Sequence, residues 1–76
     1  MKLYVLTHCA AEQNYTPQVF NNKEKAVEAL KDMYEGFLCE GDYVASDELY
    51  ATCAEVVYID DTYDRLDIFE VNLEES

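Results

Sequence analysis

Hydrophobic and strand-forming residues open the chain in a closely spaced pattern. Residues 2–8, KLYVLTH, are rich in strand formers and are apolar on both sides of the alternation, which predicts a central β-strand. Residues 15–20, YTPQVF, predict a second strand, antiparallel to the first because the connection between them is short. Pro17 has no amide proton to donate to a sheet, so we expect this second strand at an edge or at a bulge.

A helical period follows the second strand. Apolar residues recur every three or four positions along residues 26–37, which predicts one amphipathic helix. We expect this helix to begin at Asn21, with Glu24 completing a capping box. It should end near Glu40, because Gly41 is a suitable left-handed terminator.

The C-terminal third of the chain predicts a β-hairpin. Residues 51–59 and 65–73 are the two strands, and residues 60–64, DDTYD, form the turn between them. The alternation breaks at residues 69–70, which indicates a bulge or a strand that is only partly covered. Residues 46–50 fit either a short helical turn or the approach to a long strand.

The element order is therefore β-β-α-β-β, and the predicted fold class is α+β. One amphipathic helix on a four-stranded, mostly antiparallel sheet buries its single apolar face. We expect one domain spanning residues 1–76. A chain of this size buries only about 60% of the surface that its unfolded form exposes, which leaves little room for a core and an enclosed substrate pocket together. The size therefore argues against an enzyme.

Acidic residues are concentrated in one part of the chain. Residues 32–76 contain fourteen Asp or Glu and one base, Arg65, whereas residues 1–31 carry a net charge of +1, for a total of −12. Such one-sided charge opposes folding through self-repulsion, yet the chain is 50% hydrophobic with seven tyrosines and should fold. The acidity argues against binding bare nucleic acid or an anionic membrane surface. It favours solubility, cations or a basic partner.

The residues that carry redox, metal or catalytic chemistry form no recognisable motif. Three cysteines without a C-x-x-C pair, and an N-terminal apolar stretch too short for a signal peptide, predict a cytoplasmic protein with reduced thiols. His8 and Cys9 are neighbours on a strand and point to opposite faces, so they form no direct catalytic pair. The chain lacks zinc-ligand spacing, and residues 60–64 lack an EF-hand pattern. We therefore expect no catalytic residues, no metal and no cofactor.

The acidic residues predict a surface that imitates nucleic acid. Alternate side chains on a strand lie about 6.6–6.8 Å apart, and helical i and i+4 carboxylates stand about 6 Å apart, close to the spacing of successive phosphates. The plainer interpretation is an acidic shell that serves solubility alone. The candidate partner-binding residues are Glu28, Asp32, Glu35, Asp42, Asp47, Glu48, Asp60, Asp61 and Asp64.

Three segments resemble the small acidic proteins of bacteriophages and mobile elements, namely MKLYVLTH, VFNNKEKAVEAL and RLDIFEVNLEES. Several proteins of that kind are anti-CRISPR or anti-restriction inhibitors, some of them DNA mimics. The resemblance implies a non-enzymatic inhibitor whose partner is a basic nucleic-acid-binding protein, such as a Cas nuclease or a restriction complex. Two other hypotheses stay open: an interaction module that binds through Tyr and a sheet edge, and a small enzyme with a low-pKa thiol and His8. The sequence also leaves open whether the chain forms a homodimer.

Overall fold

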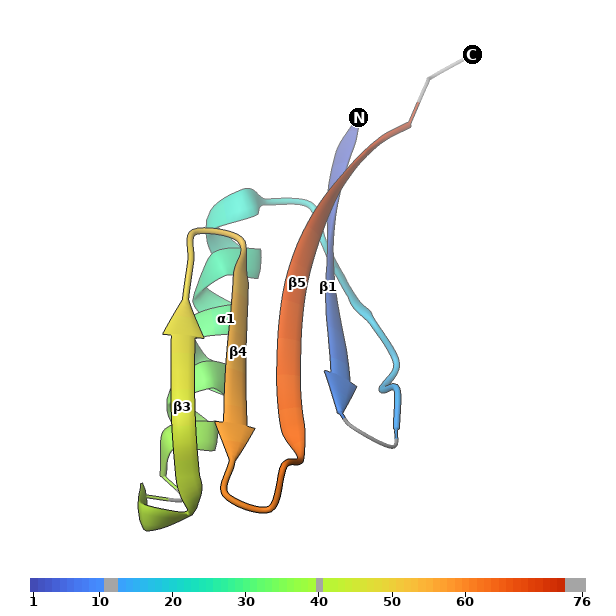
Figure 1. Ribbon diagram of the computed structural model, residues 1–76. Coiled ribbons are helices and arrows are strands. Elements are labelled where there is room, and N and C mark those ends of the chain that lie inside the picture. Colours follow the sequence, from blue (N-terminus) through green and yellow to red (C-terminus); the bar gives the residue numbers. More distant parts are fainter. Residues whose placement is uncertain (11–12, 40, 74–76) are drawn as a thin grey trace.

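The chain folds into an antiparallel sheet with one helix packed on one of its faces (Figure 1). The computed structural model describes residues 1–10, 13–39 and 41–73. The elements are β1 (Lys2–Ala10), β2 (Gln18–Phe20), α1 (Lys23–Leu38), the 3-10 helix η1 (Gly41–Tyr43), β3 (Val44–Leu49), β4 (Cys53–Tyr58) and β5 (Tyr63–Asn72). The five strands lie in the order β2-β1-β5-β4-β3.

The predicted α+β class is confirmed, but the predicted sheet of four strands is one strand short. The additional strand is β3, which forms from the segment whose conformation the sequence left open. After Val44, every residue of β3 is exposed. This strand has no buried face and therefore no hydrophobic alternation, and its pairing with β4 defines it.

The N-terminal strands occupy the predicted places. β1 lies between β2 and β5 and pairs antiparallel with both, so its central position is confirmed. β2 lies at one edge of the sheet, as predicted, and Pro17 directly precedes the strand instead of lying within it. It is three residues long, shorter than the predicted strand over residues 15–20.

The helix begins one residue later than predicted. Its N-cap is Asn22, whose side-chain oxygen accepts hydrogen bonds from the backbone N–H groups of Glu24 at 2.8 Å and Lys25 at 3.3 Å. The capping box expected between Asn21 and Glu24 is therefore wrong. The helix ends at Leu38, and the predicted end at Glu40 lies outside the described residues. Gly41 adopts the expected left-handed conformation, with φ 56°, and opens η1.

The C-terminal hairpin is confirmed with a shorter turn than predicted. The turn covers residues 59–62, and Tyr63 and Asp64 belong to β5 rather than to the connection. β5 stays in register with β1 through Phe69 and Glu70, so no bulge interrupts it there. Instead, Phe69 lies on the uncovered side of the sheet and is 54% exposed.

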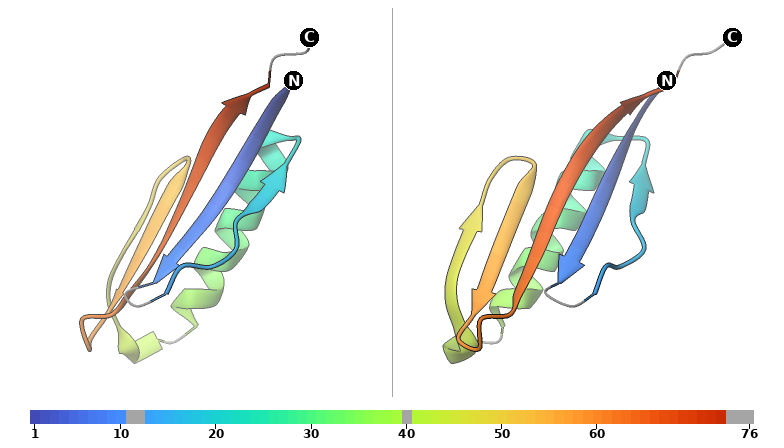
Figure 2. Two further views of the ribbon diagram at one scale, coloured as in Figure 1. Left: turned by 90° about the vertical axis from the view of Figure 1, so that its right-hand side faces the viewer. Right: turned by 45° about the vertical axis from the view of Figure 1, so that its right-hand side comes forward.

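The core lies between α1 and the sheet face that it covers (Figure 2). Leu6, Leu30, Val56 and Leu66 are its largest fully buried side chains. A register shift between Val44 and Ser46 changes which face the rest of β3 presents to the helix. The other face of the sheet has no covering layer among the described residues, and no described helix is long and apolar enough to cross a membrane.

The two ends of the molecule are formed by different elements. At one end, the first residues of β1 and the last residues of β5 project beyond the helix (Figures 1 and 2). At the other end, the helix finishes close to η1 and to the turn between β4 and β5. The second end brings together acidic residues from η1 and from the hairpin turn.

Candidate functional site

The predicted acids of the helix form a row on its outer side. Glu28, Asp32 and Glu35 are all exposed and lie opposite the buried helix residues Ala26 and Leu30. Among the described residues, none of these three carboxylates forms an ion pair. We call these three residues the outer acidic row.

A second group of predicted acids lies at the end of the molecule where α1 finishes. Asp42 is in η1, and Asp60 and Asp61 are in the turn between β4 and β5; all three are exposed. The carboxylate of Asp60 accepts hydrogen bonds from the hydroxyl of Tyr43, from the hydroxyl of Thr62 and from the Thr62 backbone N–H. The bonds from Thr62 and Tyr43 lower the pKa of Asp60 below its ordinary value of 3.8. Asp60 therefore also has a structural task, because it joins the turn to η1.

Two other predicted acids are directed toward the helix-covered side of the sheet. Asp47 accepts a hydrogen bond from the hydroxyl of Tyr34, which raises the pKa of that tyrosine. Asp64 contacts Nε2 of His8 at 2.7 Å through one oxygen, and its other oxygen accepts a hydrogen bond from the Tyr58 hydroxyl at 2.7 Å. Both acids were predicted to bind a partner, and the structure gives both of them hydrogen-bond partners within the chain.

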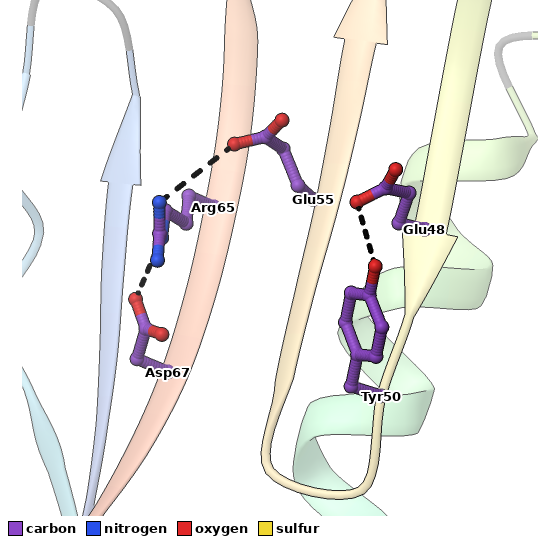
Figure 3. A network of polar contacts seen from close by, with 5 residues as sticks. All are labelled: Glu48, Tyr50, Glu55, Arg65 and Asp67. Atoms are coloured by element: carbon purple, nitrogen blue, oxygen red, sulfur yellow. Dashed lines mark hydrogen bonds and ion pairs between the residues drawn. The ribbon is translucent and has the colours of Figure 1, made fainter.

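Glu48, the last predicted acid, lies on the open face of the sheet, beyond which the helix is seen in Figure 3. Its carboxylate accepts a hydrogen bond from the Tyr50 hydroxyl at 3.1 Å, and Glu48 pairs across the strands with Glu55. Arg65 contacts Glu55 at 4.0 Å and Asp67 at 3.0 Å. The bond to Asp67 raises the pKa of Arg65. The single base of residues 32–76 is thus already engaged by acids of the open face.

The structure also shows a cavity that the sequence did not predict. It has a volume of about 310 Å³ and lies at the end of the sheet where β1 and β4 finish and β5 begins. Its lining includes three tyrosines and one aspartate. The lining residues are Ala10, Gln13, Tyr15, Tyr58, Thr62, Tyr63 and Asp64.

His8 holds one wall of this cavity in place. Its ring stacks on Tyr15, with centroids 4.3 Å apart and an interplanar angle of 13°, and lies 5.2 Å from the ring of Phe37. The backbone N–H of Tyr15 donates to the carbonyl of His8 at 3.0 Å. Together with its contact to Asp64, His8 joins β1, α1, β5 and the segment after β1. The cavity is therefore lined partly by strand residues and partly by the segments that follow β1 and β4.

The three thiols lie on three different elements. Cys9 and Cys53 are half-buried on strands, and Cys39 is the exposed C-cap of α1. As neighbours on β1, His8 and Cys9 point to opposite faces of the sheet. Within the described ranges, no three His, Cys, Asp or Glu side chains are placed to hold a metal ion.

The signal for the outer acidic row was in the sequence, because the helical period places Glu28, Asp32 and Glu35 together. The cavity had no such signal, since the turn was predicted to include Asp64. In comparison with known proteins, no family model matches the chain, and no curated protein and no solved structure matches it.

Proposed function

We propose that this protein is a non-enzymatic inhibitor that binds a basic nucleic-acid-binding protein, of the Cas nuclease or restriction complex type, through an acidic surface. The observation that carries the proposal is the outer acidic row. Its three carboxylates are exposed and form no ion pair within the described part of the chain, although Lys25 and Lys31 lie on the same helix. These charges are free to meet a basic surface.

The position of the row supports nucleic-acid mimicry. Along the helix axis, Glu28 and Asp32 are separated by about 6 Å, and Glu35 lies about 4.5 Å further on. The helix then finishes at the end that carries Asp42, Asp60 and Asp61. A groove that holds nucleic acid uses Lys and Arg to contact successive phosphates along one strand. The row and the acidic end offer such a groove a comparable series of negative charges.

Solubility alone does not account for this arrangement. Acids of like charge at i, i+3 and i, i+4 on a helix are destabilising, each pair by about 0.2–0.5 kcal/mol. A surface that mixes both signs gives solubility without that cost. Lys25 and Lys31 offset this cost at Glu28, and Lys31 offsets it at Glu35, so the cost falls mainly on Asp32. A basic partner would compensate that charge.

The test is capture of the partner from nuclease-treated host lysate, followed by identification of the bound protein and elution with rising salt. The row variant is Glu28→Lys/Asp32→Lys, and the control for net charge is Glu55→Lys/Glu70→Lys on β4 and β5. Because Glu55 and Glu70 contact Arg65 and Lys2, the fold of the control is verified by amide spectra before its binding is compared. We expect release at moderate salt, competition by added duplex DNA, and at least tenfold weaker binding for the row variant only. Equal loss in both variants would show that only total charge matters, and normal binding by the row variant would refute mimicry.

A second candidate is an interaction module that uses the β3 edge. β3 pairs with β4 on one side and with no other strand among the described residues, and Tyr50 directly after it is 58% exposed. Such an edge can accept an additional strand from a partner. The same capture experiment separates the two functions: binding through this edge would survive high salt and would weaken in Tyr50→Ala.

A further inference from the structure

We infer that the tyrosine-lined cavity binds a guanidinium group, namely an arginine side chain of the basic partner. This inference rests on the proposed function and identifies one contact of that partner. The cavity is lined by one aspartate, Asp64, and by three tyrosines, Tyr15, Tyr58 and Tyr63. An aromatic wall beside a carboxylate is a suitable environment for a planar organic cation.

The carboxylate in the cavity has no cationic partner from Lys or Arg. The Asp64 side chain is 18% exposed, and within the described ranges its one ion-pair contact is with His8. The neighbouring Arg65 lies with Glu55 and Asp67 on the open face of the sheet. A cation entering the cavity would give the Asp64 carboxylate the Lys-type or Arg-type partner that the described part of the chain does not supply.

Asp64 can still accept hydrogen bonds from a ligand. An ionised carboxylate offers about four acceptor positions. His8 and the Tyr58 hydroxyl occupy two of them, one at each oxygen. The two contacts also hold the carboxylate in one orientation, so a bound cation does not have to fix it. The remaining acceptor positions suit the N–H groups of a guanidinium.

The size and walls of the cavity favour arginine over lysine. A volume of about 310 Å³ is at the lower end of the range for ligand sites, about 300–1,000 Å³, and suits a single side chain. Tyr15 uses ring surface to stack on His8 and also lines the cavity, and Tyr63 forms another part of the wall. A guanidinium is planar and weakly hydrated, so it stacks on such rings, whereas a lysine ammonium keeps a stronger hydration shell.

The first arm of the test uses the whole chain without a partner. N-acetyl-arginine methylamide is titrated into labelled protein and followed by amide chemical shifts, with the neutral isostere N-acetyl-citrulline methylamide as control. We expect saturable shifts at Gln13, Tyr15, Thr62 and Tyr63, with at least tenfold weaker binding of the citrulline compound. Equal responses to both compounds, or no saturable shift at these residues, would overturn the inference.

Variants test whether the cavity itself is responsible. Tyr63→Leu removes one tyrosine from the cavity lining and should weaken arginine binding at least fivefold, whereas Tyr50→Leu, at the site drawn in Figure 3, should leave it unchanged. Asp64→Asn removes the charge but also alters the contacts of His8 and Tyr58, so its fold must be verified by amide spectra before its binding is interpreted. Equal binding by Tyr63→Leu and the native chain would count against the cavity.

The second arm separates a partner arginine from a free guanidinium compound. In the capture experiment, Tyr63→Leu should weaken the complex at least tenfold while the outer acidic row is intact. Native binding by Tyr63→Leu would overturn the partner as the source, even if the free compound still bound. Conversely, the native chain could bind the arginine compound while the row variant captures the partner normally. That pair of results would refute the proposed mimicry and leave the guanidinium site standing.

Discussion

Within the outer acidic row, Asp32 is the residue whose charge should lower the free energy of unfolding most. Its helical neighbours at three and four residues are Glu28, Ala29, Glu35 and Gly36, so both charged neighbours are acidic, like Asp32 itself. The substitution Asp32→Asn removes the charge and leaves the helix propensity almost unchanged. We therefore expect the variant to be more stable than the native chain.

The size of the gain follows from the two like-charge pairs that disappear. Each pair costs about 0.2–0.5 kcal/mol, so the free energy of unfolding should rise by about 0.4–1 kcal/mol. For a domain of this size, that gain raises the Tm by about 2–8 °C. The gain should shrink at 1 M salt, where the Debye length is about 3 Å and exposed charges are largely screened.

The assay is thermal and urea unfolding of Asp32→Asn at low salt and at 1 M salt. The matched control is Glu28→Gln, because Glu28 has two acidic neighbours, Glu24 and Asp32, and two basic neighbours, Lys25 and Lys31. Its gains and losses should cancel, and its Tm should stay close to the native value. A native or lower Tm for Asp32→Asn at low salt would refute the reasoning. Under the proposed function, the same variant should bind its partner less tightly while being more stable.

Two further predictions concern carboxylates that the fold uses. Tyr34→Phe removes the hydrogen bond to Asp47 and should cost about 0.5–1.5 kcal/mol in urea unfolding. That bond raises the Tyr34 pKa, so its contribution to stability is present below the ordinary value of 10.0 and is lost as the pH rises through the raised pKa. The variant should therefore lose less stability than the native chain in alkali. An equal alkaline loss would contradict this prediction. Asp60 has a lowered pKa, so its contribution is present above 3.8 and is lost as the pH falls through the lowered value. Asp60→Asn should therefore show a flatter Tm profile below that pH, and an unchanged profile would count against the bonds from Thr62 and Tyr43.

The elements with a strong local period could be predicted, and those defined by distant pairing could not. The helix and the strands around it have buried faces, which leave a pattern in the sequence. β3 has no such pattern, because every residue after Val44 is exposed and the strand exists through its pairing with β4. The helix start was misplaced because Asn21 and Asn22 are both good caps, and local sequence does not choose between them.

The candidate site shows the same division. The outer acidic row could be predicted because the helical period alone brings its three residues together. The inward direction of Asp47 depends on the register shift after Val44, and the position of Asp64 depends on where the hairpin turn ends. The cavity depends on the alignment of Ala10 with Asp64, which lie far apart in the chain. None of these three features is encoded in a local sequence pattern.

Tyrosine hydroxyls hold several acids in place in this chain of 17 acids and five bases. Within the described residues, carboxylates accept hydrogen bonds from four tyrosine hydroxyls, in the pairs Tyr34–Asp47, Tyr43–Asp60, Tyr50–Glu48 and Tyr58–Asp64. A phenol hydroxyl donates to a carboxylate without bringing a positive charge, so these contacts hold the acids in place and preserve the net charge. The acids of the outer row have neither a tyrosine nor a basic residue as a partner there. They are the charges that the fold does not use, and this makes them the strongest candidates for binding outside the chain.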